Sequence, residues 1–170
     1  MWFIFPRNGL ISHDSPEMSG LPSKQIRITG EFRHGIDPKN RITIPSDWRT
    51  GDGDEFFVRL HSSGSHILAF PPEKLDKDVA EIQARTEIPL ARRQELIRQL
   101  SAGVRRCNAD KQGRMVLPDE FRIKADLKPE VELFLLGGYD HFQIWNPQRW
   151  TAERAVVEIK NQELAGELGI

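Results

Sequence analysis

The chain contains one sequence motif twice, and this repeat constrains the fold more than any other feature. Residues 37–49 read DPKNRITIPSDWR, and residues 110–122, which lie 73 positions later, read DKQGRMVLPDEFR. The copies share an aspartate, two arginines, two apolar positions, a proline and an aromatic residue. The matched pairs are Asp37 and Asp110, Arg41 and Arg114, Ile42 and Met115, Ile44 and Leu117, Pro45 and Pro118, Trp48 and Phe121, and Arg49 and Arg122. Because the chemistry is repeated along with the spacing, we expect two equivalent halves in one chain.

Each copy is predicted to form the turn of a β-hairpin. In the first half, residues 32–37 lead into the turn, and residues 41–44 leave it with the alternation and β-branched side chains of a strand. Asn40 and Gly113 hold equivalent positions at the tip, and both residue types tolerate a positive φ angle. A left-handed residue is therefore expected in each turn. The aspartate that opens each copy is expected to accept hydrogen bonds from backbone N–H groups two residues further on.

A short helical turn is expected after the proline of each copy, because proline cannot donate to a sheet ladder and ends the strand. Ser46 and Asp119 follow the prolines and are the expected caps of these turns. The aromatic residues that come next, Trp48 and Phe121, are interpreted as core residues rather than as platforms for stacking bases.

Each half continues with a second hairpin and a helix. Residues 55–60 and 66–70 are the predicted strands in the first half, and residues 131–136 and 141–145 are their counterparts. Helices are predicted to start at Pro72 and at Asn146-Pro147, where asparagine caps and proline takes the first helical position. A second helix carries the apolar face of Leu96, Ile97 and Leu100 between the halves, and an amphipathic helix is expected around residues 150–164.

These patterns divide the chain into five segments. Residues 1–24 are expected to be a loose tail, with Met18 just ahead of the patterned region as an alternative start. Residues 25–75 form the first half, which opens with a predicted strand at residues 25–29. Residues 76–100 are the connecting helices, residues 101–150 the second half, and residues 151–170 the C-terminal helix.

Charge is balanced overall but segregated along the chain. The net charge is −1, so there is no global positive field. Residues 24–49 hold six Lys or Arg and three acidic residues, and residues 85–124 hold ten and five. Both copies of the motif therefore lie in locally basic tracts, which favours one surface that meets an anion.

The same composition argues against several other classes of protein. A single cysteine, Cys107, excludes a disulfide framework and a multi-thiolate zinc site, and it fits a reducing cytoplasm. No run approaches the roughly 18 apolar residues of a membrane-spanning helix. The five histidines lack close metal-ligand spacing, so we expect no metal and no other cofactor. The serines between His61 and His66 are interpreted as turn residues of a hairpin loop rather than as nucleophiles.

The pattern Asp-x-x-x-Arg, then apolar, x, apolar, Pro, x, x, aromatic and Arg, resembles the MraZ family of bacterial transcriptional regulators. The two copies, the helix pair between them and Ile144-Trp145 before the last helix carry this resemblance, which covers about residues 28–158. It implies a mainly β fold with peripheral helices (α+β), in which two AbrB-like swapped-hairpin halves form a pseudo-dimeric β-barrel. It also implies a cytoplasmic, nucleoid-bound protein that forms homo-oligomeric rings. Its partner would be double-stranded DNA, at short direct repeats upstream of the division and cell-wall gene cluster, where family members usually repress.

The resemblance carries over to particular residues, with departures in both halves. The family's Asp, Lys and Arg correspond to Asp37, Lys39 and Arg41 in the first half. The second half has Asp110 and Arg114, but its lysine, Lys111, directly follows the aspartate, and Gln112 stands where lysine is usual. The first half has Asn40 where glycine is usual.

The candidate DNA-binding residues are the cations of the two turns, Lys39, Arg41, Lys111 and Arg114. A lysine at a tip has few intramolecular partners, so both lysines are predicted to contact DNA. An arginine can fork onto guanine or onto a phosphate, or it can bond to the turn aspartate, and both roles stay open for Arg41 and Arg114.

The remaining motif residues are predicted to be structural. The turn residues Asp37, Asn40, Asp110 and Gly113 are expected to hold the tip, because an acid has little reason to face phosphate. Arg49 and Arg122 are expected to pair with an acid behind the core aromatics.

Two other functions are alternatives to DNA binding. The first is an AbrB-like interaction module of the antitoxin type, which would bind a protein partner through its helices. The second is an enzyme with a small-molecule substrate, which the sequence disfavours because it offers no convergent acid–base set.

Overall fold

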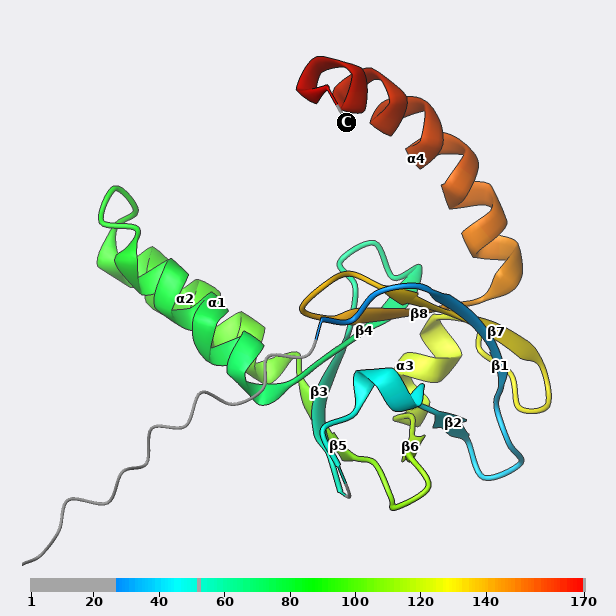
Figure 1. The fold of residues 1–170 in the computed structure, drawn as a ribbon. Coiled ribbons are helices and arrows are strands. Elements are labelled where there is room, and N and C mark those ends of the chain that lie inside the picture. Colours follow the sequence, from blue (N-terminus) through cyan, green and yellow to red (C-terminus); the bar gives the residue numbers. More distant parts are fainter. Residues whose placement is uncertain (1–26, 52, 170) are drawn as a thin grey trace, which may run out of the picture.

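The computed structural model describes residues 27–169 except residue 52 (Figure 1). The predicted tail at residues 1–24 lies outside the described residues, as do the first two residues of the predicted strand at 25–29. Within the described part of that strand, Ile28 forms an isolated antiparallel bridge to Tyr139. The elements, in chain order, are β1 (Glu31–Gly35), β2 (Arg41–Thr43), the 3-10 turn η1 (Ser46–Trp48), β3 (Glu55–Leu60), β4 (His66–Phe70), α1 (Pro72–Ala84), α2 (Leu90–Ala102), β5 (Arg105–Asn108), β6 (Arg114–Val116), α3 (Asp119–Lys124), β7 (Glu132–Gly137), β8 (Phe142–Trp145) and α4 (Pro147–Leu168).

The strands form two antiparallel sheets, which confirms a mainly β fold with peripheral helices. Six strands make one sheet in the order β1-β7-β8-β4-β3-β5, and β2 pairs with β6 as a separate two-stranded ribbon. Figure 1 shows this ribbon on one side of the larger sheet, where β2 contacts β1 and β6 contacts β5. The described strands do not close into a barrel.

Three of the strand pairs in the large sheet join the two halves of the chain. β1 pairs with β7, β5 pairs with β3, and β4 pairs with β8, so each of these ladders contains one strand from each half. The predicted second hairpins are confirmed, because β3 pairs with β4 and β7 with β8. The predicted first hairpin forms only at its turn. Its flanking strands take their ladder partners from the other half, where Ile42 of β2 is buried and Phe32 of β1 packs against the core.

The core lies between the large sheet and the ribbon. Ile42 and Met115 face each other across the ribbon and are both fully buried. Trp48 is also buried, and its indole N–H donates to the carbonyl of Thr29 at 2.9 Å. Phe121 is buried in the same cluster. The prediction that Trp48 and Phe121 are core residues is therefore confirmed, and the motif's alternation is explained by burial of one face of each ribbon strand.

The caps of the short helical turns differ from the prediction. Pro45 and Pro118 occupy the cap positions, and no side chain caps either turn. Ser46 and Asp119 are instead the first helical residues. The side chain of proline has no acceptor for the first N–H groups of the helix, so neither turn has a side-chain cap.

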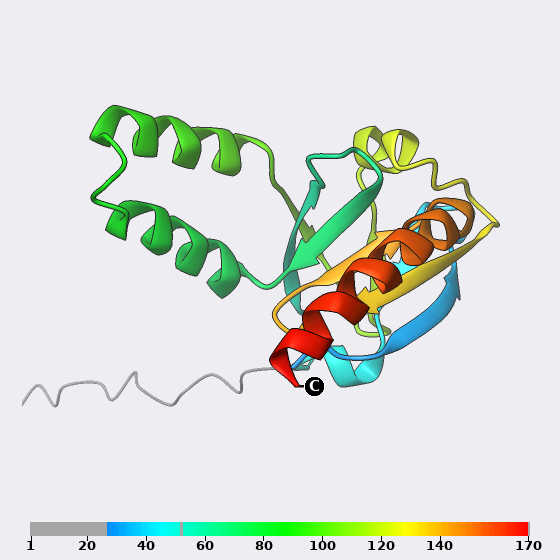
Figure 2. The same cartoon turned by 90° about the horizontal axis from the view of Figure 1, so that it is seen from above.

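The helices lie at the periphery. Figure 2 shows α1 and α2 as a pair that extends away from the sheets, and neither helix contains a buried residue. The predicted start of α4 is confirmed, because the Asn146 side chain accepts hydrogen bonds from the backbone N–H groups of Gln148 and Arg149. Trp150 of α4 packs against Trp145 of β8, with ring centroids 5.4 Å apart. None of the described helices is long and apolar enough to cross a membrane.

Candidate nucleic-acid interface

The turn between β1 and β2 is organised by one carboxylate. Asp37 Oδ1 accepts the backbone N–H groups of Lys39 at 2.8 Å and Arg41 at 2.9 Å, and Asp37 Oδ2 accepts Arg41 Nε at 2.6 Å. Asn40 has a φ of 60°, which is the predicted left-handed conformation. A single side chain thus fixes both the backbone of the turn and the base of the arginine.

The turn between β5 and β6 repeats this geometry. Asp110 Oδ1 accepts the backbone N–H groups of Gln112 at 3.0 Å and Arg114 at 2.9 Å, and Asp110 Oδ2 accepts Arg114 Nε at 2.8 Å. Gly113 has a φ of 77°. Both aspartates thus bond the backbone of their turns, and the equivalent residues Asn40 and Gly113 are left-handed; that these four residues serve only to hold the turns stays a prediction.

These hydrogen bonds keep both carboxylates charged. The pKa of Asp37 lies below its ordinary value, chiefly because of the Arg41 backbone N–H and secondly because of its guanidinium. The pKa of Asp110 is also lowered, chiefly by the hydrogen bond from the Arg114 side chain. Each turn is therefore held by an ion pair at neutral pH, with the arginine partly exposed at 25% for Arg41 and 37% for Arg114.

The ribbon carries one turn at each of its ends, and both turns lie on the same side of the fold. Arg41 pairs with Val116, and Thr43 pairs with Arg114, so these four residues share the face opposite the buried Ile42 and Met115. Both turns lie at the side of the fold away from α4 (Figure 1). The result is a surface of two tips and an exposed ribbon face, which we call the ribbon surface: residues 37–43 and 110–116.

The lysines of the two tips are the most available cations on the ribbon surface. Lys39 and Lys111 are exposed, and neither forms an ion pair with another described residue. They are not in equivalent positions, because Lys39 aligns with Gln112 and Lys111 aligns with Pro38. Each tip therefore offers one free ammonium group, but from a different place in the turn.

The two arginines that close the motif behave differently from each other. Arg122 follows the prediction, since it pairs with Asp119 at 3.2 Å and donates to the Leu127 carbonyl at 2.9 Å. For Arg49 the expected acid pair is not found among the described residues. Its guanidinium instead lies against Gly113, where an added Cβ would come within 2.7 Å of Arg49 Cζ. The only sequence signal for this contact is the change from asparagine to glycine between equivalent positions.

Other basic residues near the motif are engaged in local contacts. Arg105 pairs with Glu120 at 2.8 Å, and Arg106 pairs with Glu55 at 3.4 Å. Arg33 lies over the Phe134 ring, 5.0 Å from its centroid. They are held on the strand surface and are less available to DNA than the tip lysines.

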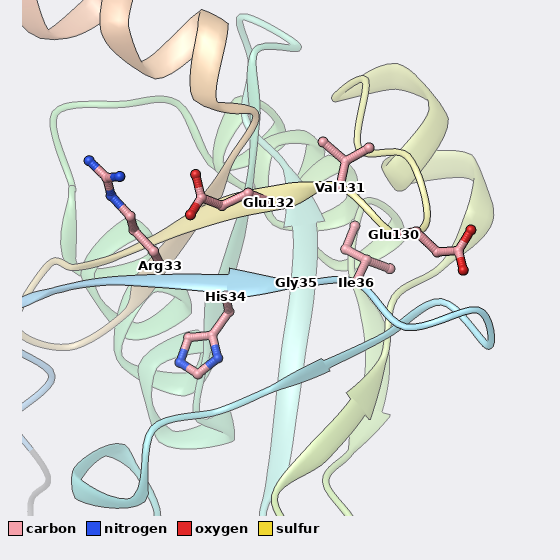
Figure 3. A pocket seen from close by; sticks show the side chains of 7 residues that line it. All are labelled: Arg33, His34, Gly35, Ile36, Glu130, Val131 and Glu132. Atoms are coloured by element: carbon pink, nitrogen blue, oxygen red, sulfur yellow. The ribbon is translucent and has the colours of Figure 1, made fainter.

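A hollow of about 460 Å³ opens beside the end of β1, lined by residues 33–36 and 130–132. Figure 3 shows Arg33 and His34 on opposite sides of β1, with Glu130 turned away from both. Glu132 lies on the same side of β1 as Arg33, but His34 and Glu130 point elsewhere, so the polar groups of the lining do not converge on one point as in a small-molecule site (Figure 3).

The histidine and serine loop forms a local network. His61 Nδ1, Ser63 Oγ, Ser65 Oγ and His66 Nδ1 follow one another at 2.8, 2.6 and 2.9 Å. His66 is buried between the rings of His61 and Trp145, and this burial lowers its pKa to about 4. The serine hydroxyls bond within the loop, as the turn interpretation predicts. Among the described residues, no group of three His, Cys, Asp or Glu side chains could hold a metal ion.

The family model and the known proteins that match this chain all carry the same family name. Residues 100–163 match the family model described as "MraZ protein, putative antitoxin-like". The chain is 30% identical over 148 residues to the transcriptional regulator MraZ of Caldicellulosiruptor saccharolyticus, which covers 84% of this chain and 99% of that protein. It is 33% identical over 124 residues to the transcriptional regulator MraZ of Lactiplantibacillus plantarum, covering 71% and 83%. For the transcriptional regulator MraZ of Lachnoclostridium phytofermentans the values are 32% over 121 residues, 71% and 82%.

Proposed function

Because the chain belongs to the MraZ family, we propose that it is a DNA-binding transcriptional regulator whose ribbon surface contacts the duplex. The relatives are named as regulators, and the protein is not an enzyme. The finer proposal is that it represses the division and cell-wall gene cluster by binding short direct repeats upstream of it. It would then act in the cytoplasm, at the nucleoid.

The observation that carries this function is the β2–β6 ribbon, which holds the two tips at its ends on one surface. The major groove of B-DNA admits a two-stranded β-ribbon, and arginine and lysine are the side chains that read guanine and neutralise phosphate. Arg41 and Arg114 are held partly exposed by their aspartates, and Lys39 and Lys111 extend freely beside them. Four cations of one surface can thus face one stretch of duplex.

The two halves are proposed to act as a pseudo-dimer of AbrB-like swapped hairpins. Support comes from the strand pairs, since β1, β2 and β5 all take partners from the opposite half. In this arrangement residues 25–75 and 101–150 are the equivalent halves, and residues 76–100 and 151–170 are peripheral helices. Neither half would bury its apolar strand faces without the other.

Several subunits are proposed to assemble into a homo-oligomeric ring. The peripheral helices support this, because α1 and α2 have no buried residue and α4 exposes Val156, Leu164 and Leu168. One ribbon surface reads little sequence alone. A ring would place several such surfaces on one DNA molecule and raise their effective concentration.

The function is tested by salt-dependent binding to the DNA upstream of the protein's own coding region. Each lysine that neutralises a phosphate adds about 0.9 to the slope of log K against log salt. The double variant Lys39→Ala/Lys111→Ala should therefore flatten the slope by about 1.8 for each subunit engaged. A matched control, Lys77→Ala/Lys160→Ala, removes two exposed lysines from α1 and α4 and should leave the slope unchanged.

Equal slopes for the wild type and the tip variant would remove the ribbon surface from DNA binding. The competing function is a protein-binding module, which the antitoxin-like family description and the protruding α1–α2 pair favour. Its signature would be a stable complex with a protein partner, no binding to duplex DNA, and loss of the complex on substitution of Leu96 or Leu100.

A further inference from the structure

The two tips of the ribbon surface share a backbone but differ in how their arginines are engaged. Arg41 uses Nε to bond Asp37, and its two terminal nitrogens have no hydrogen-bond partner among the described residues. Neither of these nitrogens is a buried unpaired atom, so both reach solvent. The guanidinium of Arg41 is therefore fixed through Nε, while its two terminal nitrogens face solvent.

The end of Arg114 is more fully occupied. Its Nε and Nη2 both lie 2.8 Å from Asp110 Oδ2, and Nη2 also donates to Gln112 Oε1 at 3.0 Å. Gln112 stands at the position that Lys39 fills in the first tip, and a lysine has no acceptor to offer there. Only Nη1 of Arg114 is free of partners among the described residues.

This difference bears on what each arginine can recognise. Bidentate recognition of guanine O6 and N7 needs two N–H donors on one edge of the guanidinium. Arg41 offers its terminal edge already oriented by Asp37, so little conformational entropy is lost when it binds. Arg114 is somewhat more exposed, but it would have to give up its bond to Gln112 to present the same edge.

We propose that Arg41 reads a guanine while Arg114 and Lys111 anchor the phosphate backbone, and that Gln112 is the positioning residue that withholds Arg114 from base readout. This inference rests on the proposed DNA-binding function and assigns separate roles to the two tips of that surface. A phosphate contact needs only charge and a single donor, and the second tip retains both.

The division of roles gives the subunit a direction on DNA. The antiparallel ribbon relates the two tips by an approximate twofold, and equal tips would read both orientations of a site alike. With one reading tip and one anchoring tip, the two orientations become distinguishable. Subunits arranged in a row would then select sites repeated in the same orientation.

The experiment uses the full chain, a duplex library with a randomised central window, and a scrambled duplex as the non-specific probe. Arg41→Lys keeps the charge and removes the fork, so it should lower the preference for guanine at one position about tenfold. Arg114→Lys should leave the selected sequence profile unchanged. Arg114→Ala should weaken binding to selected and scrambled duplexes by the same factor.

A reciprocal exchange tests the role assigned to Gln112 without altering either arginine. Gln112→Ala removes the acceptor of the second Nη2 N–H of Arg114, while the contact of Nη2 with Asp110 remains, and it should add a second guanine preference to the profile. Lys39→Gln places an acceptor beside Arg41 and should reduce the original guanine preference, whereas Lys39→Ala removes the same charge and should not. Thermal unfolding of each variant verifies that the turn is intact.

The outcomes separate this inference from the function on which it rests. Loss of guanine preference in Arg114→Lys but not in Arg41→Lys would overturn the assignment while leaving DNA binding in place. So would Gln112→Ala and Lys39→Gln variants that keep the wild-type profile. A wild-type protein that binds neither the library nor the scrambled duplex would overturn both the assignment and the proposed function.

Discussion

Substitution of Gly113 by alanine tests the geometry on which the ribbon surface depends. Gly113 has a φ of 77°, and a side chain in the left-handed region costs about 1–2 kcal/mol. An added Cβ would also lie within 2.8 Å of three guanidinium atoms of Arg49. Because Arg49 Nε has no hydrogen-bond partner among the described residues, moving the guanidinium costs packing but breaks no hydrogen bond donated by Nε. We expect a total loss of about 2 kcal/mol, or roughly 4–8 °C in Tm.

The measurement is chemical denaturation at one fixed protein concentration, since assembly would make stability depend on concentration. Asn40→Ala is the matched control, because Asn40 has the same backbone conformation at φ 60° and already carries a side chain. Its loss should be about 1 kcal/mol, including the 3.1 Å hydrogen bond to Asp119. In an Arg49→Ala background, Gly113→Ala should retain only the backbone cost. A Gly113→Ala variant as stable as the wild type would refute the left-handed turn. Equal losses of stability in Gly113→Ala and Asn40→Ala would refute the contact of Gly113 with Arg49.

Two further predictions concern buried titratable groups. Burial raises the pKa of the Cys107 thiol to about 11, so the native protein should react with a thiol reagent at pH 8 far more slowly than the urea-unfolded protein; equal rates would contradict its burial. Burial lowers the pKa of His66 from 6.5 to about 4, so the unfolded state binds the proton more tightly, and stability should fall as pH falls from about 6.5 to 4. His66→Phe keeps a ring between His61 and Trp145 and should make the free energy of unfolding nearly independent of pH between about 6.5 and 4. The same pH dependence in the wild type and the variant would contradict the role of His66.

Local patterns in the sequence were sufficient for the turns and for most element boundaries. The left-handed residues, the turn carboxylates, the second hairpins and the capped start of α4 all follow from short-range chemistry, which acts between residues a few positions apart. The same reasoning failed at Ser46 and Asp119. Serine and aspartate often cap helices, but here a proline precedes each of them and occupies the cap position itself.

The repeat in the sequence located the candidate site, but it did not determine which partners the side chains of that site have. The motif identified the cations of the ribbon surface and left open whether the arginines hold the turn or face outward. In the structure, Nε of both arginines bonds to the turn aspartate, and the terminal nitrogens of Arg41 have no hydrogen-bond partner within the described ranges. The bond from Arg114 to Gln112 depends on side-chain rotamers, which spacing along the chain does not specify.

Partner choice among the strands was decided by the tertiary structure. Alternation along residues 41–44 and 114–117 indicates which face of each strand is buried, but the same alternation suits any neighbour. β2 pairs with β6 because Ile42 and Met115 are buried against each other at the same level of one core, although 73 positions separate them in the chain. The contact of Arg49 with Gly113 has the same origin. Neighbouring residues set the conformation of each segment, whereas burial shared between distant segments sets which of them meet.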